Sequence, residues 1–299
     1  MDTTASAPPL EAAPAVAPRR VYRHTLAVRL MHWINVVCLT ILLGSGLNIF
    51  NAHPALYWGD HSSTKPWLSM RGENTPAGPV GKTRIGNTDF DTTGVLGLSA
   101  VDGRPTARAF PSWATIPGPQ WLAMARHWHL FFAWLFVING IAYVLYTIFS
   151  RHPVRDLVPT RIELKNIGRS IVDHIKLKHP TGDAATRYNV LQSLTYLIVI
   201  FGLLPLVVIA GIAMSPRLDA VFTGWVDLLG GRQSARSLHF LAALGLVLFV
   251  VVHVVEVVIA GVWNEMRSMI TGWYRVPEDP KEKAAPSAPA AVRSTEIVQ

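Results

Sequence analysis

Residues 237–264 read SLHFLAALGLVLFVVVHVVEVVIAGVWN, and this stretch decides the fold class. It contains a single charged side chain, Glu256, in 28 residues. A helix rises 1.5 Å per residue, so about 20 apolar residues cross the hydrocarbon core of a bilayer. A buried helix of a soluble protein rarely continues for this length without further charges. The segment is therefore expected to span a membrane.

Three further stretches contain no Asp, Glu, Lys or Arg: Leu30–Phe50, His127–Ser150 and Tyr188–Pro216. Only 15% of the 299 residues are charged, and the mean hydropathy is +0.30, whereas soluble proteins average about 25% charged residues. We therefore predict an all-α fold, an integral membrane four-helix bundle with a long periplasmic loop between helices 1 and 2. The predicted spans are about 30–50, 127–150, 188–216 and 237–264, and the loop is 51–126.

The distribution of Lys and Arg predicts the orientation of these spans. The connection 151–187 carries eight basic residues, and the connection 217–236 carries three. Short loops that are rich in Lys and Arg stay in the cytoplasm. Both termini are therefore expected on the cytoplasmic side, and loop 51–126 is expected on the periplasmic side of a bacterial inner membrane.

The remaining composition describes the flanks and excludes several classes of protein. Residues 1–20 are rich in Ala and Pro, and they and residues 276–299 are predicted to be disordered cytoplasmic tails around a four-span domain, 21–275. The net charge of +8 is attributed to loops that face an anionic leaflet, so no nucleic-acid partner is expected. The single cysteine, Cys38, excludes an internal disulfide, a four-cysteine iron–sulfur cluster and covalent c-type haem attachment.

Two histidines on the last span give the strongest functional signal. His239 and His253 are 14 residues apart, which on an α-helix means ~21 Å of rise and nearly the same face. A histidine inside a span is costly without a partner and is a functional candidate by default. Because successive spans run in opposite directions, His32 lies level with His253, and His129 lies level with His239. Two imidazoles on facing helices match the axial ligation of haem iron, so the sequence predicts two b haems, one near each membrane face.

Nearby residues are weaker candidates, and alternatives remain open for them. Gly46 follows His32 by 14 residues and Gly140 follows His129 by 11, so each helix could bind one haem and leave room for the other. Ordinary small-residue packing in membranes explains the same glycines equally well. His127 is the alternative to His129 as a ligand, because the two point to different sides of the helix.

Two charged residues near the predicted cytoplasmic face are further candidates. Arg29 lies one turn before His32 and could pair with a haem propionate, or it could be a cytoplasmic anchor. Glu256 lies three residues after His253 and could accept a proton from a quinol, or it could cap or pair near the interface. No residue is assigned a catalytic role.

Three segments around these histidines carry a resemblance to a known family. They are RLMHW at Arg29–Trp33, RHWHLFFAWLF at Arg126–Phe136, and LHF at Leu238–Phe240 followed by His253. They resemble the bacterial cytochrome b561 and nickel–iron-hydrogenase b-type cytochrome group, over roughly residues 21–264. The resemblance implies a membrane cytochrome with two b haems that passes electrons between a partner and the quinone pool. Its ligand positions correspond to His32, His129, His239 and His253.

Loop 51–126 is longer than the corresponding connection of the stand-alone members, so the resemblance leaves the partner and the direction of electron flow open. We expect an electron-transfer subunit whose periplasmic partner, such as a molybdenum enzyme or another dehydrogenase, exchanges electrons near His129 and His239. A quinone would react near His253. A stand-alone superoxide:quinone oxidoreductase has the same ligands and is the alternative. A proton-coupled transporter is a remoter alternative, disfavoured by four spans without an inverted repeat.

Overall fold

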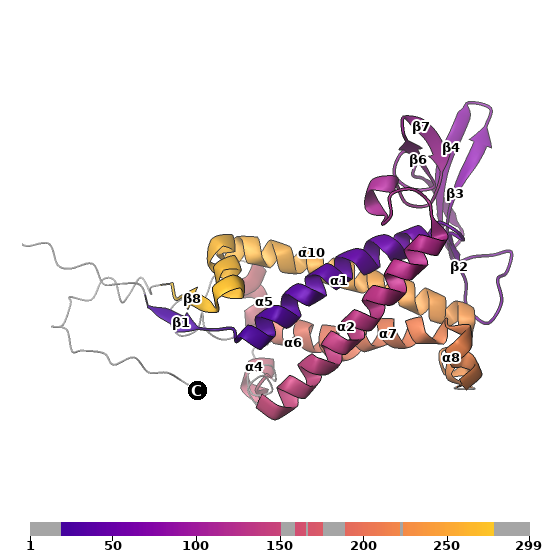
Figure 1. Cartoon of the computed structure of the whole chain (residues 1–299). Helices are drawn as coiled ribbons and strands as arrows, with labels where there is room; N and C mark the ends of the chain where they lie inside the picture. Colours follow the sequence, from indigo (N-terminus) through magenta and orange to yellow (C-terminus); the bar gives the residue numbers. More distant parts are fainter. Residues whose placement is uncertain (1–18, 151–158, 166, 176–188, 222–223, 278–299) are drawn as a thin grey trace, which may run out of the picture.

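The computed structural model describes residues 19–150, 159–165, 167–175, 189–221 and 224–277 of the chain. Within this part, four helical segments are long and apolar enough to cross a membrane, and they lie together in one bundle (Figure 1). They are α1 (Leu26–Phe50), α2 (Leu122–Ser150), a third segment (Val190–Ala213) and α10 (Arg232–Thr271). The chain is thus a multi-pass membrane protein, and each helix except the third extends beyond its predicted span.

The third segment is not one regular helix. α6 (Val190–Ile198) begins at an Asn189 capping box, the π-helical turn η3 (Val199–Leu203) follows, and α7 (Leu204–Ala213) has Pro205 in its first turn. Proline lacks a backbone N–H, and its ring clashes with the preceding turn of an α-helix. The wider π-helical turn before Pro205 accommodates the ring without ending the span.

Short helices complete the helical part. The described residues of the connections form α4 (Arg161–Lys165), α5 (Ile167–Ile175), α8 (Pro216–Val221), α9 (Trp225–Leu228) and the 3-10 turn η1 (Ser112–Ala114). Most of the basic connection 151–187 lies outside the described residues. The orientation inferred from its charges therefore stays a prediction.

Apolar side chains cover the outer surface of the bundle. Phe131 on α2 is 67% exposed, and Leu248 and Val251 on α10 are 65% and 56% exposed. A water-soluble monomer rarely exposes large continuous apolar surfaces of this kind. Bilayer lipid covers such a surface without cost, so the exposure agrees with the membrane assignment.

The bundle is built from two helix pairs. α1 packs along α2, and α7 packs along α10. In the first pair, the buried Asn139 of α2 donates from Nδ2 to the Met31 carbonyl at 2.9 Å and to Asn35 Oδ1 at 2.8 Å, both on α1. A hydrogen bond between helices in an apolar region satisfies a buried amide and fixes the register of the pair.

The prediction of an all-α fold is wrong, because the segment between α1 and α2 contains β-sheet (Figure 1). The strands β2 (Ala55–Leu56), β3 (Leu68–Thr75), β4 (Gly78–Ile85) and β5 (Thr88–Asp91) form an antiparallel sheet in that order. The strands β6 (Leu98–Val101) and β7 (Arg104–Ala107) form a separate hairpin. We call residues 51–120 the sheet domain, and the end of the bundle that carries it the sheet end.

The sheet domain is rich in polar residues and glycine, which hides its strands from a hydropathy pattern. Gly72 and Gly81 pair directly across β3 and β4, and a Cβ at Gly81 would lie 2.3 Å from the Leu96 carbonyl oxygen. Glycine therefore lets the β6–β7 layer approach the sheet. The turn at Asp102 and Gly103, whose φ angles are 49° and 76°, is the Asp-Gly type that joins tight hairpins.

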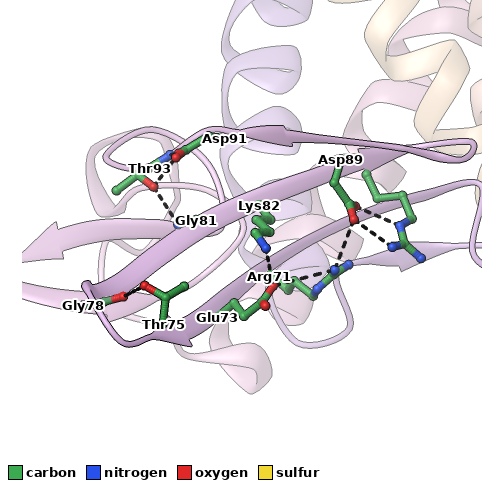
Figure 2. Close-up of polar contacts among 10 residues, drawn as sticks. Arg71, Glu73, Thr75, Gly78, Gly81, Lys82, Asp89, Asp91 and Thr93 are labelled. Atoms are coloured by element: carbon green, nitrogen blue, oxygen red, sulfur yellow. Dashed lines mark hydrogen bonds and ion pairs between the residues drawn. The ribbon is translucent and has the colours of Figure 1, made fainter.

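The exposed face of the sheet carries a network of ion pairs, which Figure 2 shows. Arg84 donates from Nε and Nη2 to the two carboxylate oxygens of Asp89, both at 2.8 Å. Lys82 Nζ lies 3.0 Å from Glu73 Oε2, and Arg71 lies 3.6 Å from Asp89. Pairs that are open to solvent contribute little to stability, so the network keeps the face soluble and its strands in register.

An apolar cluster joins the sheet domain to the bundle. Its buried members are Phe50, Leu56, Leu68, Met70 and Ala109, and Trp67, Leu96, Phe110 and Phe240 pack against them. The ring centres of Phe50 on α1 and Phe240 on α10 are 5.0 Å apart. The cluster thus contains the end of α1, the start of α10 and residues of two strands, β2 and β3, so the sheet domain and the bundle share one core.

A buried arginine organises the loop that leads back to α2. Arg108 is 5% exposed and donates to the carbonyls of Phe110 (2.6 Å) and Gly118 (3.3 Å) and to Thr115 Oγ1 (3.0 Å). Asn48 of α1 donates to the carbonyls of Pro117 (2.6 Å) and Pro119 (2.9 Å) in the same loop. These charged and amide donors satisfy backbone carbonyls that the sheet leaves unpaired.

The other end of the bundle brings the two ends of the described chain together, and we call it the terminal end. β1 (Arg20–Tyr22) pairs antiparallel with β8 (Trp273–Arg275). The predicted tails therefore include ordered residues: Arg20 is in β1, and the Val276 amide donates to the Arg19 carbonyl at 3.0 Å. Residues 1–18 and 278–299 of the predicted tails lie outside the described residues.

Candidate functional site

Two of the predicted histidines meet at the sheet end. His129 of α2 and His239 of α10 are half-buried, and their ring centres are 6.1 Å apart with an angle of 64° between the planes. The two residues belong to different helix pairs, so the rings face each other across the junction between the pairs. His127, the alternative to His129, has an exposed side chain.

Hydrogen bonds fix the orientation of both rings at the sheet end. His239 Nδ1 lies 2.7 Å from the Val207 carbonyl oxygen, which can only accept, so Nδ1 carries the proton. Ser45 Oγ donates to the Ile41 carbonyl at 2.6 Å and accepts from His129 Nδ1 at 3.1 Å. Each imidazole therefore keeps the lone pair of Nε2 free, which is the tautomer that a metal ligand needs.

A glycine lies against each ring of this pair. A Cβ at Gly46 of α1 would be 3.3 Å from His129 Cε1, and a Cβ at Gly211 of α7 would be 3.2 Å from His239 Cε1. His129 and His239 thus each pack against the neighbouring helix of their own pair, at a glycine. Gly211 is not among the predicted site residues, because its span carries no histidine.

The other two histidines meet at the terminal end. His32 of α1 and His253 of α10 have ring centres 6.4 Å apart and planes at 61°. Phe249, one turn before His253, stacks on its ring at 5.7 Å and 16°. His32 Nδ1 is buried and has no hydrogen-bond partner among the described residues. This pair therefore has the same spacing as the first but fewer groups that hold its rings.

The spacing of both pairs fits a metal held between two imidazoles. Two metal–nitrogen bonds of about 2.0–2.1 Å, plus about 1 Å from each nitrogen to its ring centre, place the centres roughly 6 Å apart. The observed separations are 6.1 and 6.4 Å. No cluster of three or more His, Cys, Asp or Glu side chains occurs among the described residues. Two nitrogen donors leave the remaining positions of an iron ion to a porphyrin, so the donor sets suit haem.

The two pairs lie at different depths. His239 and His253 are 14 residues apart on a stretch of α10 without a break in helical geometry. The corresponding rise is ~21 Å. One pair is therefore near each end of the spanning region, and any two cofactors there would share α10 as their common support.

The remaining predicted site residues lie near these pairs. A Cβ at Gly140 of α2 would meet no atom within 4 Å, so the position faces open space and its role stays a prediction. Glu256 lies on α10 one turn after His253 and is half-buried. Both residues are on the terminal half of their helices, level with His32 and His253 and not with the sheet-end pair.

Arg29 and Trp33 hold the last turn of α10 against α1. Arg29 Nη1 donates to the Ile270 carbonyl, while Arg29 Nε is buried without a partner among the described residues. Trp33 Nε1 donates to the Met269 carbonyl at 3.1 Å. The two donors lie on either side of His32 in the sequence of α1. They therefore position the turn that carries His32 and also hold the end of α10 against α1. Pairing of Arg29 with a haem propionate stays a prediction.

The sheet domain is bonded to the first turns of α10, just before His239. Ser237 Oγ accepts from Trp67 Nε1 at 3.0 Å and donates to the Tyr57 carbonyl at 2.6 Å. The Gly59 amide donates to Ser234 Oγ at 2.8 Å. Trp67 in turn stacks on Trp58, which is 54% exposed, with ring centres 5.8 Å apart. An aromatic pair thus connects the surface of the sheet domain to the helix that carries His239.

Two histidines outside the spans have lowered pKa values. Burial, together with the nearby Arg23, lowers the pKa of His24 to about 4. Burial and the nearby Arg236 lower the pKa of His53 from its ordinary value of 6.5. Both imidazoles are neutral at pH 7, so arginines supply the positive charge beside them.

Comparison with known proteins finds a family model and a relative that each match most of the chain. A family model described as prokaryotic cytochrome b561 matches residues 23–272. The putative protein-methionine-sulfoxide reductase subunit YedZ1 of Azospira oryzae is 27% identical over 234 residues, which cover 78% of this chain and 89% of the relative. No solved structure matches the chain. The region matched by the family model includes both histidine pairs and the sheet domain.

Proposed function

Because the chain belongs to the prokaryotic cytochrome b561 family, we propose that it carries electrons through the membrane between quinone and an oxidoreductase bound at the sheet end. Membership makes it a membrane b-type cytochrome with a role in electron transfer. The proposal adds the number of haems, their ligands and the two reaction partners.

Four imidazoles are the proposed axial ligands of two b haems. His129 and His239 would hold one haem, and His32 and His253 would hold the second. Haem b supplies a reversible one-electron couple when it is bound in this way. The protein contributes the free Nε2 lone pairs, the hydrogen bonds to Ser45 and Val207 that orient two of the rings, and the exclusion of water.

The sheet domain is the proposed docking side for the oxidoreductase. It shares a core with the starts and ends of the spans at that end and connects an exposed aromatic pair to α10. The name of the Azospira oryzae relative describes a subunit of a methionine-sulfoxide reductase. By analogy, the partner here would be a reductase that receives electrons from the haem held by His129 and His239. The orientation predicted by the positive-inside rule would put this partner in the periplasm.

The terminal end is the proposed site of quinone chemistry. Quinol oxidation releases protons as well as electrons, and a carboxylate near the haem provides an acceptor for them. Glu256 lies one turn beyond His253 on α10 and is half-buried. His253 would therefore be the ligand nearest to the quinone, on the cytoplasmic side of the membrane.

The single observation that carries the proposal is the presence of two ring pairs, 6.1 and 6.4 Å apart, at two depths of one bundle. The test is a pyridine haemochrome assay and a reduced-minus-oxidised spectrum of the purified protein. The wild type should bind about two haems per chain, and His253→Ala and His129→Ala should each leave about one. His127→Ala, two residues from His129 but exposed, is the matched control and should keep both.

Two results would contradict the proposal. A purified wild-type protein without a haem spectrum would exclude both sites. Two haems retained in His253→Ala or in His129→Ala would show that other side chains ligate the iron. A role of the sheet domain in docking is tested separately with Trp58→Ala, which should slow reduction of the periplasmic partner while both haems remain bound.

A further inference from the structure

At the terminal end, outside the histidine pairs, a cavity is lined by basic and aromatic side chains. Its volume is about 410 Å³, and it is lined by Trp263, Asn264, Arg267 and Arg275. None of these residues contributes to the haem ligation proposed above. We propose that the cavity binds the phosphate of an anionic phospholipid from the adjacent leaflet.

A break in α10 and the hydrogen bonds of one asparagine build the cavity. Gly261, with φ 106° and ψ 83°, interrupts α10 and redirects its last turns. After this break, Asn264 Nδ2 donates to the Arg275 carbonyl at 2.8 Å, and Asn264 Oδ1 accepts from the Arg275 amide at 3.0 Å and from Arg267 Nη2 at 2.8 Å. One asparagine therefore fixes the side chain of Arg267 and the backbone of Arg275, and both arginines line the cavity.

Arg267 and Arg275 carry positive charge that no acidic side chain of the described structure neutralises. Arg267 Nε is buried and has no hydrogen-bond partner within the described ranges. Arg275 stands directly opposite Arg20 in the pairing of β8 with β1, and like charges placed opposite each other destabilise a sheet. The nearest acidic side chain on this turn, Glu265, lies 3.5 Å from Arg23 and is thus already paired. An anion in the cavity would remove this cost.

The two guanidinium groups indicate the chemical class of the anion. The guanidinium group presents several N–H donors in one plane and matches the oxygens of a phosphate better than those of a small halide. Two arginines with Asn264 between them offer donors to two or more phosphate oxygens. A phosphate ester of either a lipid or a soluble metabolite would satisfy this chemistry.

The depth of the cavity indicates a lipid as the source. From Ser237 to Gly261 the helix α10 has 25 residues, or about 36 Å of rise, slightly more than the hydrocarbon core. The cavity therefore lies at the level of the headgroups. Trp263, which is 87% exposed, and Trp273, which is 48% exposed, lie at the same level, where tryptophan is enriched in membrane proteins. A diffusing phosphate would not need these exposed aromatic rings.

The experiment measures lipid binding to the full-length haem-loaded protein. The wild type, Arg267→Gln, Arg275→Gln and the control Arg161→Gln are placed in phosphatidylcholine nanodiscs with or without phosphatidylglycerol. Arg161 is an exposed arginine on α4, outside the cavity, so its variant changes the net charge equally. Phosphatidylglycerol should raise the unfolding temperature of the wild type and of Arg161→Gln. Native mass spectrometry should show affinity for this lipid reduced roughly tenfold or more in both cavity variants.

Additional measurements distinguish a lipid phosphate from a soluble phosphate, and loss of binding from loss of folding. Inorganic phosphate and glycerol 3-phosphate at millimolar concentration should not reproduce the stabilisation, and equal stabilisation by either would overturn the lipid as ligand. Arg267→Lys retains the charge without the planar fork and should recover only part of the affinity. Haem content of every variant reports whether it has folded. Folded cavity variants with the lipid affinity of the wild type would overturn the proposal.

Discussion

The two histidine pairs have nearly the same spacing but very different surroundings. At the sheet end, Ser45 and the Val207 carbonyl hold the two Nδ1 atoms, and the sheet domain shares a core with the helices. At the terminal end, His32 Nδ1 has no partner among the described residues, and the end is closed by a two-stranded sheet. The comparison indicates that the spacing of the histidines is set by the helices, whereas the hydrogen bonds around their rings differ. Such hydrogen bonds would tune the potentials of the proposed haems.

The largest effect should come from filling the close contact at Gly211. In Gly211→Leu, the Cβ alone would lie 3.2 Å from His239 Cε1, so the ring must move and the sheet-end haem should be lost. The haemochrome assay should fall from about two haems per chain to about one. Gly202→Leu, on the same span with nothing within 4 Å of its Cβ position, is the control. Loss of both haems in Gly211→Leu would show that haem binding at the terminal end depends on the sheet end.

A large but local loss of stability should follow substitution of the buried arginine in the sheet domain. Arg108→Gln would leave the Phe110 and Gly118 carbonyls without their donors, at a cost of roughly 2–5 kcal/mol. Hydrogen exchange should increase in the sheet domain and remain unchanged in β1 and β8. The control Arg104→Gln alters an exposed arginine in the neighbouring hairpin. An equal increase in hydrogen exchange in the sheet domain and in β1 and β8 would contradict the separate stabilisation of the two ends.

A smaller effect should separate the potentials of the two haems. Ser45→Ala removes the acceptor for His129 Nδ1–H, which makes the imidazole a weaker donor and disfavours the oxidised iron. One midpoint potential should rise by roughly 20–65 mV, the equivalent of about 0.5–1.5 kcal/mol for one electron. Thr40→Ala removes a hydroxyl that also bonds to a helix carbonyl but should change neither potential. A redox titration followed optically checks both.

The smallest effect is expected on the exposed face of the sheet domain. The Arg84 guanidinium, through its hydrogen bonds, holds the pKa of Asp89 below its ordinary value of 3.8. The pair thus stabilises the fold above that pH, and the contribution is lost as pH falls through the lowered pKa. Because both groups are solvated, Asp89→Asn should leave the unfolding temperature at pH 7 nearly unchanged. A loss as large as that of Arg108→Gln would contradict this.

The membrane part of the fold could be predicted from the sequence because one property, the length of the charge-free segments, decides it. Long charge-free segments fix the number of spans, and helical geometry then fixes which histidines are level with each other. The ring contacts of His32 with His253 and of His129 with His239 follow this reasoning. Their role as haem ligands stays a prediction until haem content is measured.

The sheet domain could not be recognised in the same way. Buried and exposed residues alternate poorly along its strands, since β5 is exposed along its whole length and β3 and β4 contain glycines at the contact with the β6–β7 layer. The Asp102-Gly103 dipeptide was a readable hairpin signal. Gly211 was missed for a different reason: its importance depends on the packing of α7 against α10, which hydropathy does not reveal.

The pairing of β1 with β8 also constrains the order of assembly. The strands, Arg29 with Ile270, and His32 with His253 all join the first spanning helix to the last. During synthesis, the first helix can form these contacts only after α10 has left the ribosome. A chain truncated before α10 would lack His239, His253 and β8, and therefore both histidine pairs and the strand pairing that closes this end.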